Sequence, residues 1–194
     1  DWVQYFQDMF EKQAGARVSR IPFDIRTNTL YTDLASMAIE ANPDGILLLA
    51  NAVDTAMVCQ QLAKLDAEPA LYATGWSYSD DLIQFGGKSV EGLAIIQSAD
   101  PEDPAPAMQS FVKHYRQRFR ATPNFPAVHA YDATRMILAI MRQETDPEAI
   151  RNHLLNMESY SGLQSDLSLD RFGELKHPKL HFARIANGQF VSAD

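Results

Sequence analysis

Helical stretches and short apolar runs alternate along the first half of this sequence, and that alternation restricts the possible fold more than any other feature. The clearest apolar run is residues 46–50, which follows a turn-forming segment at residues 42–45. Continuous apolar runs of this length are typical of strands buried on both faces of a parallel sheet. Further runs at residues 70–73 and 92–97 extend the pattern. The sequence therefore predicts an α/β fold in three layers, with helices on both faces of a parallel sheet.

Apolar residues three and four positions apart predict the main helices, and a proline-rich, acidic segment at residues 100–106 divides them into two groups. Residues 18–23 are expected to form a short extended segment, and Asn187-Gly188 is a strong signal for a hairpin turn near the end of the chain. The predicted helices span residues 1–13, 33–41, 55–65, 79–86, 107–120, 127–142 and 147–157.

Charge and cysteine content exclude several classes of protein. The 194 residues carry a formal net charge of −8, whereas binding to nucleic acid or to an anionic membrane surface favours positive charge. With one cysteine, Cys59, the chain cannot form an internal disulfide or a zinc site built from cysteines. Cys59 lies on the apolar face of a predicted helix, so we expect a small buried side chain.

Motifs of enzyme chemistry are absent from the sequence. It contains no phosphate-binding loop, no dinucleotide-binding glycine motif and no nucleophile elbow. His177 and His181 have a spacing that could hold a metal ion on a helix, but Pro178 between them argues against a helix, and we expect surface histidines on a loop. We therefore predict no catalytic residues, no metal and no cofactor.

Small and polar residues follow two of the predicted strands, and ligands of open α/β sheets bind beyond the carboxyl ends of the strands. Both segments lead into the N-terminus of a predicted helix, whose free amides favour a carboxylate or another anion. The alternative is that both are ordinary strand-to-helix loops. The candidate ligand-binding residues are Asn51, Ala52, Thr74, Gly75, Trp76 and Ser77.

Several short motifs, in order and across almost the whole chain, resemble the type 1 periplasmic binding proteins of the leucine/isoleucine/valine-binding group, the substrate-binding proteins of ABC transporters. The match is to the C-terminal portion of that family. The motifs are DWV at residues 1–3 with Phe10, ANPDG at 41–45, QQL at 60–62, GWS at 75–77, GG at 86–87 with VEG at 90–92, AYDA at 130–133, FG at 172–173 and GQFV at 188–191.

The resemblance implies two Rossmann-like lobes with the ligand between them. Residues 1–97 correspond to the second lobe without its first strand, residues 98–178 to the returning part of the first lobe, and residues 179–194 to a hairpin that crosses back. We therefore expect a type 1 fold that is incomplete at its N-terminus. A sheet without that strand is expected to pair with a second chain or with the missing N-terminal piece.

The resemblance also implies an extracytoplasmic protein, periplasmic or extracellular, with a lipid anchor of the parent protein as one option. Such a protein binds a small polar solute and delivers it to a membrane permease. Amino-acid binders of the group place an acidic residue near the second loop, but residues 74–77 contain none. An amino acid, a small carboxylate and an aromatic solute all remain open. The alternative functions are the sensing domain of a signalling receptor and an enzyme on a Rossmann-like fold.

Overall fold

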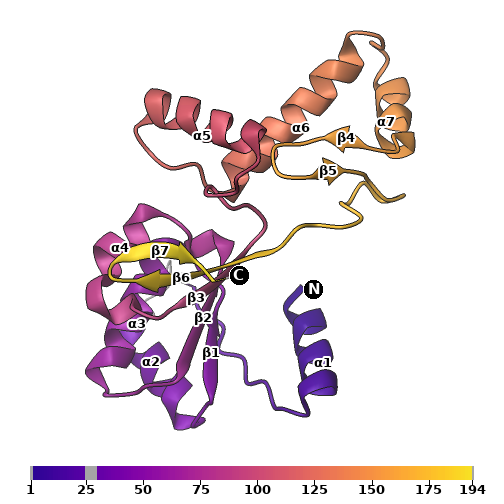
Figure 1. The fold of residues 1–194 in the computed structure, drawn as a ribbon. Coiled ribbons are helices and arrows are strands. Elements are labelled where there is room, and N and C mark those ends of the chain that lie inside the picture. Colours follow the sequence, from indigo (N-terminus) through magenta and orange to yellow (C-terminus); the bar gives the residue numbers. More distant parts are fainter. Residues whose placement is uncertain (1, 25–29, 194) are drawn as a thin grey trace.

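A computed structural model describes residues 2–24 and 30–193, and it divides into a sheet-containing part and a helical part (Figure 1). The sheet-containing part is formed by α1 (Trp2–Ala14), α2 (Tyr31–Glu40), β1 (Gly45–Leu48), α3 (Ala52–Lys64), β2 (Ala70–Thr74), η1 (Gly75–Ser77), α4 (Asp80–Gly86), η2 (Gly87–Val90), β3 (Ala94–Gln97), β6 (His181–Ala186) and β7 (Gln189–Ser192). The helical part is formed by α5 (Pro106–Phe119), α6 (Phe125–Met141), α7 (Pro147–Asn156), β4 (Tyr160–Ser161) and β5 (Asp166–Leu167).

The main sheet has the strand order β1-β2-β3-β6-β7. β1, β2 and β3 run parallel to one another, so the predicted parallel unit is confirmed. β6 pairs antiparallel with β3, and β7 pairs antiparallel with β6. The turn between β6 and β7 has positive φ at both Asn187 (53°) and Gly188 (69°), as the predicted two-residue hairpin requires.

One face of the sheet packs on α3 and α4, and α2 packs in turn on α3. Cys59 and Leu82 from these helices lie in one buried cluster with Ala73 and Ile95 from the sheet. Cys59 is buried as predicted, and burial raises the pKa of its thiol to about 12. On the opposite face of the sheet, Tyr72 remains half exposed.

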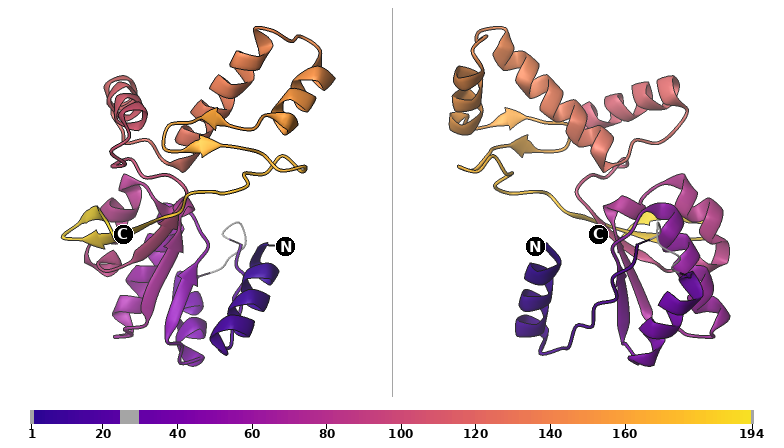
Figure 2. Two further views of the ribbon diagram at one scale, coloured as in Figure 1. Left: turned by 45° about the vertical axis from the view of Figure 1, so that its right-hand side comes forward. Right: turned by 180° about the vertical axis from the view of Figure 1, so that it is seen from behind.

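The short extended segment predicted at residues 18–23 forms no strand in the structure. β1 is the outermost strand of the sheet, and α1 with the segment after it lies beyond its outer edge (Figure 2). A strand is stable only when its backbone groups pair with a neighbour, and none of the strands within residues 2–24 and 30–193 pairs with residues 18–23. β1 is correspondingly only half buried, rather than buried on both faces as predicted.

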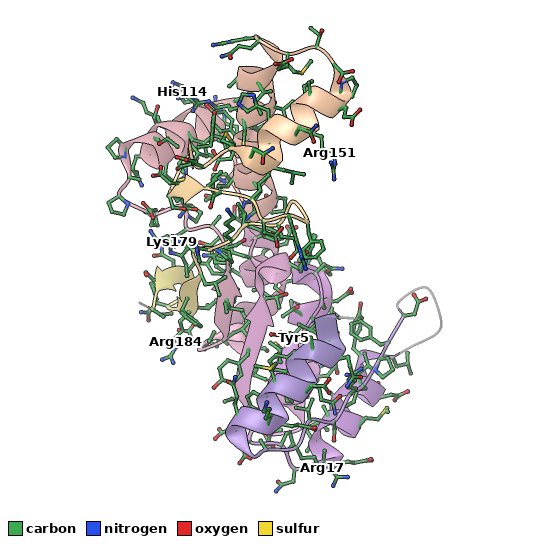
Figure 3. The ribbon with its side chains drawn as sticks, turned by 90° about the vertical axis from the view of Figure 1, so that its right-hand side faces the viewer. Tyr5, Arg17, His114, Arg151, Lys179 and Arg184 are labelled. Atoms are coloured by element: carbon green, nitrogen blue, oxygen red, sulfur yellow. The ribbon has the colours of Figure 1, made fainter. Side chains whose placement is uncertain are left out.

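Two connections join the parts of the molecule, one after β3 and one before β6. Lys179 Nζ lies 2.7 Å from Asp103 Oδ2 and so links the two connections, and Figure 3 shows Lys179 at the junction. Gln164 Nε2 also donates to Asp103 Oδ2 (3.3 Å) and lies 3.2 Å from His181 Nε2. His181 is therefore buried at the start of β6, and the prediction of a surface histidine is wrong for it, whereas His177 is exposed.

Asp103 is expected to make the stability of this junction depend on pH. Burial alone would raise the pKa of its carboxyl, but hydrogen bonds from Lys179, the Ala105 amide and Gln164 outweigh burial, and the pKa is lowered. A lowered pKa stabilises the fold above the unfolded value of about 3.9, and this contribution is lost as pH falls through the folded value. We expect Asp103→Asn to reduce the free energy of unfolding at pH 7 by about 1–3 kcal/mol and to flatten its decline below about pH 4.

Urea unfolding between pH 7 and pH 3 measures both effects. Asp66→Asn is the matched control, because Asp66 is exposed and its positive φ of 51° is one that asparagine also adopts. If the free energy of unfolding of Asp103→Asn declines below pH 4 as steeply as that of the unmodified protein, Asp103 does not contribute to this pH dependence.

Candidate ligand-binding site

The loop after β1 begins helix α3, and Asn51 is the residue that caps it. Asn51 Oδ1 accepts a hydrogen bond from the Asp54 amide (2.9 Å), and its Nδ2 donates to Asp54 Oδ2 (2.7 Å). The helix thus begins at Ala52, earlier than predicted, because asparagine satisfies a free amide of the first turn. Asp54 also accepts a hydrogen bond from the Tyr31 hydroxyl (2.6 Å), which raises the pKa of Tyr31 to about 12. Asn51 itself is exposed, whereas Ala52 is buried.

The loop after β2 is tied to the first loop by Ser77. Its Oγ donates to the Ala50 carbonyl oxygen (2.9 Å) and shares a hydrogen bond of 2.8 Å with Thr55 Oγ1. Ser77 is fully buried, so its hydroxyl holds the two loops together rather than facing solvent. The structure therefore brings the two predicted loops side by side, as parallel strands that end at one edge of a sheet require.

Gly75 and Trp76 meet the helical part of the molecule through Phe125, the first residue of α6. The rings of Trp76 and Phe125 pack edge to face, with centroids 5.0 Å apart. A Cβ atom on Gly75 would lie 3.1 Å from Phe125 Cδ1, so the absence of a side chain allows this approach. Trp76 is still 68% exposed and offers a flat apolar surface beside Phe125.

Two buried oxygens at this edge have no hydrogen-bond partner. Within residues 2–24 and 30–193, the buried side-chain atoms without a partner are Thr74 Oγ1 and Gln97 Oε1. Thr74 ends β2 and Gln97 ends the neighbouring strand β3, so both lie at the carboxyl edge that carries the two loops. A buried polar group left unpaired costs about 1–3 kcal/mol, and such groups are rare in folded proteins.

The first turns of α6 extend the same surface toward the connection after β3. His129 lies one turn beyond Phe125, with ring centroids 6.0 Å apart, and its Nε2 is 2.7 Å from Ser98 Oγ. Burial lowers the pKa of His129. Beyond it lies a small cavity of about 80 Å³, lined in part by Ser98, His129 and Asp132. The Asp132 carboxylate accepts the Leu163 amide, which fixes the turn between β4 and β5.

This arrangement suits the binding of a small molecule through neutral polar groups and aromatic rings. Within the part of the chain that the structure describes, no group of three histidine, cysteine, aspartate or glutamate side chains could hold a metal ion. The helices of that part include none with the length and apolar character needed to cross a membrane.

Sequence reasoning missed Gln97 and Phe125, because they join the site only through tertiary structure. One feature of the sequence could have identified Gln97 as a candidate site residue: it ends the predicted strand that follows the one carrying Thr74. No local pattern marks Phe125, which follows Asn124 at the start of a helix in the other part of the molecule.

Comparison with known proteins identifies the family. The sequence profile described as "Periplasmic binding protein" matches residues 3–189. The chain belongs to the periplasmic binding protein family. Its predicted resemblance to that family is therefore confirmed. A search of curated protein sequences finds no match.

Solved structures of periplasmic binding proteins share the fold. A leucine-binding protein from Thermotoga maritima superposes with a TM-score of 0.87 at 22% identity, over 99% of this chain and 55% of that one. A putative branched-chain amino acid ABC transporter protein from Rhodospirillum rubrum superposes with a TM-score of 0.76 at 25% identity, over 97% of this chain and 55% of that one. A solute-binding protein of an ABC transporter from Rhodopseudomonas palustris, solved in complex with benzoate, superposes with a TM-score of 0.84. The identity is 14%, over 98% of this chain and 53% of that one.

These likenesses confirm the predicted fold class, the α/β fold of a type 1 periplasmic binding protein with a largely parallel sheet. The chain spans about half the length of the solved relatives that it matches, with 55% of the Thermotoga protein covered.

The bridge made by Ser77 predicts a specific loss of stability. Ser77→Ala removes the donor to the Ala50 carbonyl and leaves the buried Thr55 hydroxyl without its partner. We expect the free energy of unfolding to fall by about 1–3 kcal/mol, and amide hydrogen exchange to rise in both loops.

Ser79→Ala is the control for this measurement, because the Ser79 side chain makes no capping hydrogen bond at α4. Faster exchange in only one of the two loops of Ser77→Ala would contradict the bridging role.

Proposed function

We propose that this protein binds a small organic solute, an amino acid or a small carboxylate, beyond the carboxyl ends of β1 and β2. The observation that carries the proposal is the position of Trp76. It is exposed on a loop that Ser77 ties to the loop of Asn51, and it faces Phe125 from the other part of the molecule. A solute held there would contact both parts, with neutral hydrogen-bonding groups and apolar rings around it.

The ligands of the solved relatives support this range of solutes. One is described as a leucine-binding protein, and another was solved in complex with benzoate. Both ligands are small and carry a carboxylate on an apolar body. The N-terminus of α3, capped by Asn51, suits the carboxylate through its free amides, and Trp76 suits the apolar body.

We further propose that residues 1–97 together with residues 179–194 act as one lobe and residues 98–178 as the returning part of the other. In support, β6 pairs with β3, and the helical part has its own buried cluster around Met108, Val112 and Val128. Closure around a solute would then bend the connections near residues 98 and 178, where Asp103 and Lys179 are paired.

In this proposal the protein is a binding component and not an enzyme. It collects the solute outside the cytoplasm, in the periplasm or outside the cell, and delivers it to the permease of an ABC importer. Members of the family and the solved relatives are solute-binding proteins, which supports this role.

We also propose that the outer edge of β1 pairs with a further extended segment, from the rest of the protein or from a second chain. β1 has a partner only on the β2 side within the described sheet. Apolar side chains are exposed elsewhere too, with Phe119 at 56% on α5 and Leu138 at 54% on α6. An unpaired edge and exposed apolar faces favour association.

Solute binding is tested by thermal shift and calorimetry with amino acids, small carboxylates and aromatic acids. We expect one class to raise the melting temperature without being converted. Trp76→Ala should weaken binding of that class about tenfold or more, because an aromatic contact is lost.

Tyr5→Ala is the matched control, because Tyr5 lies on α1, as Figure 3 shows. Its side chain is 66% exposed, close to the 68% of Trp76. Equal loss of binding in both variants would contradict the site, and turnover of any solute would contradict the binding role.

Association is tested by size-exclusion chromatography with light scattering and intact-mass analysis. We expect the chain to elute as an oligomer or with a second polypeptide, because the β1 edge is then paired. A stable, well-folded monomer of 21.7 kDa would rule out this part of the proposal.

A further inference from the structure

We propose that His181 is a pH switch at the junction of the two parts. As a neutral imidazole it holds Gln164, and on taking up a proton it releases Gln164 and, with it, the helical part. The inference concerns the junction alone, so it does not depend on the proposed function. It assigns a role to a buried histidine that the sequence predicts to lie on the surface.

The backbone around Gln164 fixes the orientation of its side-chain amide. Oε1 accepts the hydrogen bond of the Asp100 amide (3.3 Å), and a backbone N–H can only donate. Nε2 therefore faces the other way, toward Asp103 Oδ2 (3.3 Å) and the Asp100 carbonyl oxygen (3.4 Å). Because both of these groups only accept, turning the amide round would place like groups together at both of its ends.

His181 has to be neutral to take part in this arrangement. Its Nε2 lies 3.2 Å from Gln164 Nε2, which is a donor, so the histidine nitrogen has to accept and carries no hydrogen. The single proton of the neutral ring is then on Nδ1, which lies 3.9 Å from Asp100 Oδ2. A second proton could be added only at Nε2, where the new N–H would face the N–H of Gln164.

The charges around His181 favour the uptake of that proton. Asp100 and Asp103, on the connection after β3, are each hydrogen-bonded to the amide that Nε2 faces. Lys179, on the connection before β6, is 2.7 Å from Asp103 Oδ2 and offsets one of the two carboxylates. Gln97, opposite His181 in β3, is uncharged, as are all residues of β7. An added proton is thus attracted by the carboxylates while it excludes the amide, and both effects favour release.

Release of Gln164 would loosen the helical part, because this residue contacts both connections. It lies in the turn between β4 and β5, which Asp132 of α6 fixes through the Leu163 amide. The cavity of about 80 Å³ also borders Gln164, so its side chain has space to leave the junction. The contact of Trp76 with Phe125 joins the two parts and therefore reports a change in their relative position.

Fluorescence of Trp76 from about pH 8.5 to about pH 5 tests the proposal, in a Trp2→Phe parent that keeps Trp76 as its single tryptophan. We expect one reversible transition in this range, where histidines ordinarily titrate, with the circular dichroism of the helices unchanged. His181→Gln should abolish the transition, since glutamine still accepts from Gln164 through Oε1 but takes up no proton. Gln164→Ala should show at pH 8.5 the fluorescence that the parent shows at pH 5.

His177→Gln and His129→Gln are the controls, and both should keep the transition. His177 is exposed on the same connection, and His129 lies beside Phe125 with ring centroids 6.0 Å apart, so each tests whether another histidine causes the signal. The inference is overturned if the parent shows no transition, if the transition persists in His181→Gln, or if either control loses it. A Gln164→Ala variant that titrates as the parent does would overturn it too, and that result does not depend on the folding of the His181 variant.

Discussion

The parallel alignment of β1, β2 and β3 is the constraint on which the candidate site depends. Parallel strands end at the same edge, so Asn51, Gly75 and Gln97 are brought together although they are far apart in the sequence. Backbone pairing alone would leave the loops free to diverge beyond the strands. The buried Ser77 hydroxyl prevents this by bonding the Ala50 carbonyl and the Thr55 side chain. The site is therefore a property of the sheet and one buried side chain.

The candidate site depends, second, on a defined junction between the two parts of the molecule. Asp103, Lys179 and Gln164 join the connections before and after the helical part through one carboxylate oxygen. This leaves α6 with Phe125 against Gly75 and with His129 against Ser98. Under the proposed function, a solute bound between the two parts would act on the same junction, and its binding would be linked to the angle between the parts.

Periodicity in the sequence predicted the helices and the parallel strands, because each element buries an apolar face whose spacing is visible locally. The two loops were predictable for the same reason, since they follow recognisable strands. Strand pairing, side-chain burial and contacts that depend on tertiary neighbours could not be predicted from the sequence. Residues 18–23 have a strand-like sequence but pair with none of the described strands, His181 is buried through Gln164, and Phe125 reaches Gly75 from another part of the chain. The inward direction of Ser77 is likewise set by Ala50, 27 positions away.

Under the proposed function, the unpaired oxygens of Thr74 and Gln97 would connect stability with binding. Folding leaves both atoms out of water without a partner, which lowers the free energy of unfolding of the unliganded protein. A solute that donates to one of them restores the lost hydrogen bond only in the folded state, because the two strand ends do not converge in the unfolded chain. Under the proposed function, the same two oxygens would therefore increase the difference in solute affinity between folded and unfolded protein. Gly75 contributes through the absence of a side chain, since a Cβ there would come within 3.1 Å of Phe125 Cδ1, where this ring meets the sheet.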